Sequence, residues 1–162
     1  MRQRNFMRVL ENITYDELHI GDYATFTKTL TDEQLVLFAA ASSDINPQSL
    51  DLADVKKELL KVDIGYGMWS ESIISAAISN VIPGPGTIYL EQQLKFVREL
   101  ELGDTLTVKL TVKEKLERHR VILNCEVKNQ NSDLVVSGEA KVIAPIEKIS
   151  IEQSELPRIK IL

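Results

Sequence analysis

The sequence is poor in the residues from which several common kinds of site are built. It contains one cysteine, Cys125, which excludes a disulfide framework and a metal site made of several cysteines. Its two histidines, His19 and His119, are far apart and lack the spacing of zinc ligands. Phosphate-binding loops, dinucleotide fingerprints and nucleophile elbows are also missing. We therefore expect neither a metal nor a cofactor.

Long apolar runs and excess positive charge are lacking as well. No apolar run reaches the roughly 18 residues that a membrane-spanning helix needs, and the arginines at the start are not followed by the apolar core of a secretory signal. A net charge of −5 and a pI near 5.1 argue against binding along a nucleic-acid backbone. We expect a cytoplasmic protein that binds neither nucleic acid nor membrane.

The 162 residues suit one globular domain with flanking segments. Residues 1–20 show no clear period and are predicted to be an N-terminal arm. Residues 21–143 are the predicted domain. Residues 144–162 contain Pro145, Pro157 and mixed charges, which favour a linker or docking strap.

The N-terminal part of the domain is predicted to form a strand and then a helix. Residues 22–30 are rich in β-branched and aromatic residues, which favour a strand. Thr31 and Gln34 have the spacing of a capping box, which predicts the start of a helix. The helix is expected to end near the segment 42–47, because the residue that precedes a proline, here Pro47, avoids helical geometry.

The segment between Asp63 and Glu91 contains a single charged residue, Glu71. Within it, Met68 to Val81 has the periodicity of a helix with one apolar face and small residues on the other side. A helix with almost no charge is normally buried, and this one is too short to cross a membrane. We therefore predict a central helix, ended by the Pro-Gly-Pro-Gly sequence at 83–86.

The rest of the domain is predicted to be strand, because apolar and polar residues alternate along it. Period-two alternation indicates an antiparallel sheet with one buried face. With the first strand this makes five strands, and the central helix is the element available to cover them. The predicted fold is α+β, a five-stranded antiparallel sheet wrapped around a long helix. In the first of these segments, 87–97, the residues expected to face inward are Ile88, Leu90, Leu94 and Phe96.

The sequence Ser-Ser-Asp-Ile-Asn-Pro at 42–47 allows two interpretations. All of its polar residue types are common in helix-ending turns. Alternatively, Asp44 is a general base beyond a helix end, and the Asn46 amide orients that carboxylate or a bound water.

The start of the central helix is a second candidate site. Gly67 either frees the backbone before the helix or leaves the unpaired N–H groups of the first turn open to an oxygen that gains negative charge. Tyr66 and Trp69 either line a pocket or fill the core. Glu71, one turn later, either faces a sheet edge or subunit interface, or lies in a pocket as a base or nucleophile with a raised pKa.

Three blocks of the sequence together resemble the MaoC-like, (R)-specific enoyl-CoA hydratase family, whose members have the hot-dog fold. The resemblance extends over about Ile20 to Ile143. The blocks are Ala-Ser-Ser-Asp-Ile-Asn-Pro at 41–47, the segment 67–90 from Gly-Met through Pro-Gly-Pro-Gly to Thr-Ile-Tyr-Leu, and the segment 94–104 from Leu-Lys-Phe to Gly-Asp.

The resemblance implies binding of acyl-CoA and the syn hydration of a trans-2-enoyl-CoA, or the reverse dehydration. It assigns the catalytic aspartate to Asp44, a supporting hydrogen bond to Asn46, and the thioester oxygen to the amide of Gly67, with Tyr66 and Met68 as neighbouring substrate-binding candidates. The family's catalytic histidine is replaced by Ser49. Serine does not titrate near neutral pH, so weak or absent activity is implied.

Further differences and partners also follow from the resemblance. The family's glycine before the aspartate is Ser43 here, and the usual histidine before the helix glycine is Tyr66.

A homodimer is expected, partly because a single hot-dog unit leaves sheet edges open. Similar domains are fused to phosphate acetyl- or butyryltransferase domains, and residues 144–148 resemble the start of such a linker, which implies a covalent or separate partner domain of this kind.

Two other functions remain open for this sequence. One is an acyl-CoA thioesterase on the same fold, with Glu71 or Asp44 as the base. The other is a non-catalytic binding or assembly module, in which Glu71 and the serine-rich face of the central helix belong to an interface. Fold alone does not distinguish these from a hydratase.

Overall fold

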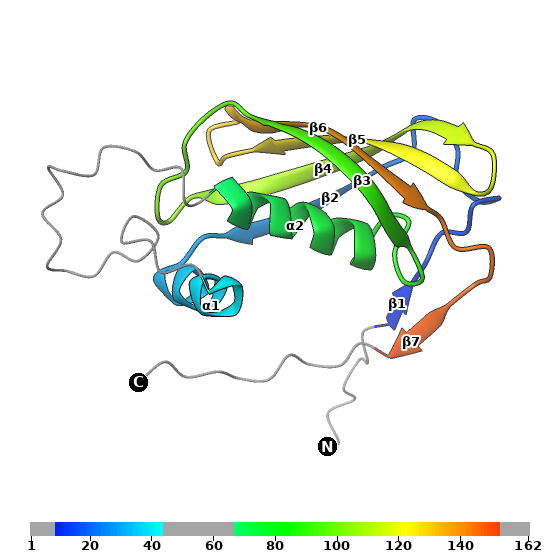
Figure 1. The fold of residues 1–162 in the computed structure, drawn as a ribbon, viewed down its shortest axis with the longest axis horizontal. Helices are drawn as coiled ribbons and strands as arrows, with labels where there is room; N and C mark the ends of the chain where they lie inside the picture. The colour runs from blue at the N-terminus through cyan, green and yellow to red at the C-terminus, as the bar shows by residue number, and fades with distance from the viewer. Residues whose placement is uncertain (1–8, 44–66, 153–162) are drawn as a thin grey trace, which may run out of the picture.

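The computed structural model describes residues 9–43 and 67–152, and in these ranges the chain forms two sheets and two helices (Figure 1). The elements are β1 (Val9–Glu11), β2 (Tyr23–Thr29), α1 (Asp32–Ser42), α2 (Gly67–Asn80), β3 (Ile88–Phe96), β4 (Thr105–Leu116), β5 (Arg120–Lys128), β6 (Leu134–Ile143) and β7 (Ser150–Glu152). Neither helix of this part of the chain has the length and apolar character needed to cross a membrane.

The main sheet has five antiparallel strands in the order β2-β4-β5-β6-β3. It curves around α2, which lies against its inner face (Figure 1) and packs mainly on β4 and β2. The predicted α+β arrangement is therefore confirmed. The inner faces of α2 and of the central strands supply much of the buried core, which includes Ile73, Ile74, Ala77, Ile78, Leu106, Val108, Leu110, Leu123, Val127 and Val142.

Each end of α1 is closed by a local hydrogen bond. The Thr31 hydroxyl accepts a hydrogen bond from the backbone N–H of Gln34 at 3.3 Å, which satisfies a donor that has no partner inside the helix. At the other end, Ser43 adopts a left-handed conformation with φ of 57°, and its N–H donates to the Ala39 carbonyl. The predicted start and end of this helix are confirmed.

The inward face of β3 differs from the prediction because the strand contains a bulge at Leu90. The extra residue changes which side chains face inward, so that residues before the bulge face the opposite side from the one that a regular alternation predicts. Tyr89 therefore faces inward, and Ile88 and Leu90 are 57% and 43% exposed. The prediction that Ile88 and Leu90 face the core was wrong, because a period-two pattern does not reveal an inserted residue. Beyond the bulge, the partly buried Leu94 packs against the core.

The N-terminal and C-terminal parts of the described chain meet in the small sheet of β1 and β7. Asn12 lies at its end and is only 1% exposed. Its amide donates to the Glu147 carbonyl at 2.8 Å and accepts from the Ile149 N–H at 2.9 Å. The N–H of Ile13 donates to the Pro83 carbonyl at 2.7 Å, which ties this pair of strands to the turn after α2.

Gly138 on β6 permits the close approach of β3. A Cβ at this position would lie 2.0 Å from the Gln93 carbonyl oxygen and 2.9 Å from the Leu94 Cα. We expect Gly138→Ala to lower the free energy of unfolding by about 1–3 kcal/mol, because β3 must move to admit the methyl group. Urea denaturation measures this, with Ser137→Ala as the control that changes stability by less than about 0.5 kcal/mol. Equal stability of the two variants would contradict the close contact.

Candidate functional site

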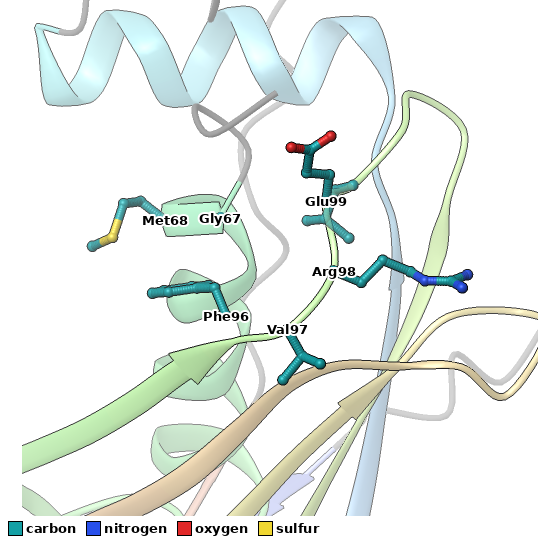
Figure 2. Close-up of a pocket in the computed structure, with 7 residues that line it drawn as sticks. Gly67, Met68, Phe96, Val97, Arg98 and Glu99 are labelled. Atoms are coloured by element: carbon teal, nitrogen blue, oxygen red, sulfur yellow. The ribbon is translucent and has the colours of Figure 1, made fainter. Parts of the chain in front are cut away.

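A cavity of about 340 Å³ lies at the start of α2 (Figure 2). One side is the first turn of the helix, and the other is the end of β3 with the loop that follows it. Its lining residues are Gly67, Met68, Phe96, Val97, Arg98, Glu99 and Leu100. The cavity therefore joins a helix start to a loop that lies about thirty residues later in the sequence.

The ring of Phe96 packs closely against Gly67. A Cβ on residue 67 would lie 3.2 Å from Cδ1 of that ring, a tighter contact than side chains normally make. Without a side chain, the backbone of the first turn stays accessible beside the ring. The first N–H groups of a helix have no partner within it and carry its positive dipole end. Gly67 thus places hydrogen-bond donors beside a largely apolar cavity, an arrangement that suits a carbonyl oxygen gaining negative charge.

Arg98 and Glu99 supply the charged part of the cavity wall. Arg98 points away from Gly67 (Figure 2), and its guanidinium forms an ion pair with Asp133 beyond β5. The rest of the wall near the helix start is apolar, with Met68, Phe96 and Val97 each about half exposed. The cavity is thus apolar next to the helix start and charged along the loop.

Glu71 lies one turn after Gly67 but is not among the residues that line the cavity. Its carboxylate accepts a hydrogen bond from the Gln92 amide at 2.9 Å, and the Gln92 carbonyl oxygen accepts one from the Tyr89 hydroxyl at 2.7 Å. Both partners belong to β3, the edge strand of the sheet. Of the two alternatives for Glu71, this position agrees with the sheet edge.

Trp69, Cys125 and His119 are not among the residues that line the cavity. Trp69 is 4% exposed and belongs to the core, so it does not line the cavity. Cys125 is fully buried, and burial raises the pKa of its thiol to about 12, so it stays protonated at neutral pH. His119 is exposed in the turn between β4 and β5, where its ring meets the ring of Tyr15 edge-on at 5.2 Å.

The other predicted site residues lie outside the described ranges. These are Asp44, Asn46, Ser49 and Tyr66. Their approach to Gly67 therefore stays a prediction. The structure adds cavity residues that sequence reasoning did not select, from Phe96 to Leu100. The signal that points to them is the third block of the family resemblance, 94–104, which includes this strand end and loop.

Comparison with known proteins identifies the class to which this fold and cavity belong. The sequence profile described as "MaoC like domain" matches residues 19–133. The chain belongs to the MaoC-like dehydratase family, which includes the (R)-specific enoyl-CoA hydratases, and it has the hot-dog fold. The family and the fold that the sequence resemblance implied are both confirmed.

Individual relatives cover most of this chain. An (R)-specific enoyl-CoA hydratase of Rhodospirillum rubrum is 31% identical over 131 residues, which are 81% of this chain and 91% of that protein. The solved R-hydratase of Pseudomonas aeruginosa, in its unliganded form, is 46% identical with a TM-score of 0.86, and the match covers 95% of this chain and 99% of that one. The R-hydratase of Aeromonas caviae is 32% identical with a TM-score of 0.71, over 79% and 98% of the two chains.

Proposed function

We propose that this protein binds enoyl-CoA and catalyses the syn hydration of a trans-2-enoyl-CoA, or the reverse dehydration. The observation that carries the proposal is the cavity at Gly67, where the first turn of a helix meets a largely apolar wall. The relatives described above are named as an (R)-specific enoyl-CoA hydratase and as R-hydratases. The thioester oxygen accepts a hydrogen bond from the Gly67 amide, which stabilises the negative charge that it gains when water adds.

The proton transfers are assigned to Asp44. Its carboxylate takes a proton from water as the hydroxyl adds to C3, and the proton is delivered to C2 on the same face. Asn46 holds the carboxylate or the water in place. In the family a histidine five residues after the aspartate shares this work, and Ser49 stands in its position. Since a hydroxyl group is not a general base near neutral pH, we expect slow turnover.

Hydration of crotonyl-CoA, a short trans-2-enoyl-CoA, tests this proposal. Addition of water removes the conjugation of the thioester, so the reaction is followed as loss of its absorbance, and chiral analysis of the product checks for the (R)-alcohol. The proposal predicts turnover above that of Asp44→Ala. Identical rates for the two proteins would contradict the assignment of Asp44 as the group that transfers protons.

We also propose that two chains associate through β3. Among residues 9–43 and 67–152, this strand pairs only with β6, so no described strand occupies its other edge. Exposed apolar side chains gather there and beside it. The other edge strand, β2, carries one exposed aromatic, Tyr23, among exposed threonines and Lys28, whose charge discourages pairing. The apolar group consists of Met68, Ile88, Leu90, Phe96 and Val97. Such a dimer would also close the open side of the Gly67 cavity.

Light scattering after size exclusion tests the dimer. We expect twice the chain mass of 18.3 kDa at micromolar concentration. Leu90→Lys places a charge on the proposed interface, where burial without a partner is costly, and should give the monomer mass. Tyr23→Lys on the opposite edge strand is the control that should stay dimeric. A monomer in the unchanged protein would contradict the association.

Release of free CoA separates the hydratase from a thioesterase. The position of Glu71 outside the cavity lining disfavours it as the base that cleaves a thioester. A thiol reagent should therefore detect no CoA while crotonyl-CoA is hydrated. A non-catalytic module without an acyl-CoA site would show neither turnover nor heat of binding with butyryl-CoA.

A further inference from the structure

Ser70 occupies a position on the core face of α2 where an apolar residue is expected. It lies three and four residues before Ile73 and Ile74 and seven before Ala77, so all four side chains share one face of the helix. Like Ile74, Ser70 has an exposed fraction of 0%. A buried hydroxyl costs free energy unless it is hydrogen-bonded, and alanine is a better helix former than serine. The packing of α2 therefore does not explain a serine here.

The Ser70 hydroxyl is hydrogen-bonded to the start of its own helix. It donates to the carbonyl oxygen of Gly67, three residues earlier. In an α-helix the same carbonyl also accepts the backbone N–H of the residue four positions later, so the hydroxyl adds a second donor and does not replace a missing one. Its effect falls on the peptide group between Gly67 and Met68, two residues that both line the cavity (Figure 2).

The other polar group of this peptide is the N–H of Met68. The C=O and N–H of one trans peptide lie in a plane and point in opposite directions. A carbonyl that points along the helix therefore directs the Met68 N–H back toward the helix start, where the first N–H groups have no partner within the helix. A hydrogen bond to the carbonyl holds the plane of the peptide and polarises it, which strengthens the N–H as a donor.

We infer that Ser70 is a positioning residue for the thioester: it orients and polarises the peptide between Gly67 and Met68, so that the Met68 N–H joins the Gly67 N–H in binding the thioester oxygen. This inference rests on the proposed function and adds a buried residue that does not touch the substrate. The oxygen gains negative charge as water adds, so a well-oriented donor stabilises the transition state more than the bound substrate. Loss of the hydroxyl should therefore lower kcat more than it changes KM.

The kinetic test compares two serines of α2 that make the same kind of hydrogen bond. Ser70→Ala should lower kcat for crotonyl-CoA hydration by about threefold to tenfold and change KM by less than about twofold, a smaller loss than the roughly 10²–10³-fold that follows removal of a donor in direct contact with the oxygen. Ser72→Ala is the control. The Ser72 hydroxyl donates to the Trp69 carbonyl at 2.6 Å, also three residues earlier, but Trp69 does not line the cavity. The kcat of this control should stay within about 1.5-fold of the unchanged protein.

Thermal unfolding and a cysteine variant separate positioning from packing. The melting temperature of Ser70→Ala should stay within about 3 °C of the unchanged protein, because alanine avoids the cost of burying a hydroxyl and the Gly67 carbonyl keeps its main-chain donor. Ser70→Cys fills the space of the hydroxyl, but a thiol is a weak hydrogen-bond donor, so it should lose as much kcat as alanine does. Recovery of kcat in the cysteine variant would show that the position needs volume and not the hydrogen bond, and would overturn the inference.

Infrared spectroscopy of a bound, unreactive thioester measures the hydrogen bond without catalysis. With butyryl-CoA labelled with ¹³C at its thioester carbonyl, binding to the unchanged protein should lower the C=O stretching frequency. Ser70→Ala should lower it less, and Ser72→Ala should lower it fully. If crotonyl-CoA binds but is not hydrated, the proposed function fails while this frequency still decides the role of Ser70. Equal frequencies in the two alanine variants, or no binding of butyryl-CoA, would overturn the inference.

Discussion

Replacing Ser49 by histidine is expected to raise kcat for crotonyl-CoA hydration by about 10²–10⁴-fold, the contribution typical of a positioned general acid or base. By the family resemblance, Ser49 takes the place of the catalytic histidine, five residues after the proposed base Asp44. An imidazole titrates near neutral pH and can take a proton from water, which a serine hydroxyl does not. Stopped-flow or steady-state absorbance of the conjugated thioester measures the change.

The gain in kcat from Ser49→His should depend on the carboxylate of Asp44. Combining Ser49→His with Asp44→Ala should remove the gain, because the two groups act as a pair. Ser49→Ala should leave kcat within about twofold, since the hydroxyl carries no proton-transfer role. If Ser49→His binds butyryl-CoA as well as the unchanged protein and still gains nothing, position 49 does not face the reacting atoms.

Replacing Asp44 by asparagine is expected to lower kcat by about 10²–10⁴-fold. The substitution keeps the size of the side chain and removes its ability to accept a proton. The affinity for butyryl-CoA should change little, because the thioester oxygen is assigned to the Gly67 amide. A fall in kcat with unchanged affinity for butyryl-CoA would therefore show that the substitution affects the chemical step and not the folding of the protein.

Asp16→Asn is the matched control for that experiment. Asp16 is exposed on the segment between β1 and β2, so its charge can be removed without affecting the cavity. Its kcat should equal that of the unchanged protein. If Asp44→Asn behaves like this control, Asp44 is part of a turn and not a base.

The sequence predicted much of the fold because local rules and hydrophobic periodicity agree along most of it. Thr31 provides a cap, so α1 begins where the sequence indicates. The face of β3 was predicted wrongly at Ile88 and Leu90, because a bulge adds one residue to the count. The pairing of β1 with β7 was not foreseen, since three-residue strands are too short to show a period. The boundaries at residues 21 and 143 stay a prediction.

The sequence predicted only the part of the candidate site that is formed by residues close together along the chain. The free N–H groups of a helix start, with glycine at that start, pointed to Gly67, and Gly67 and Met68 line the cavity. The opposite wall, from Phe96 to Leu100, comes from a strand end that only the folded chain brings to the helix. The hydrogen bond between Gln92 and Glu71 was not predicted for the same reason, because one residue lies on β3 and the other on α2, and no sequence pattern links them.

The central claim is that an acyl thioester binds with its oxygen at the amide of Gly67. Solution NMR of the ¹⁵N-labelled protein, titrated with butyryl-CoA, measures this directly. The Gly67 amide should shift strongly on binding, together with those of Met68 and Val97, while amides in the β4–β5 turn at Arg118 stay in place. Saturable binding that leaves the Gly67 resonance unchanged would contradict the account.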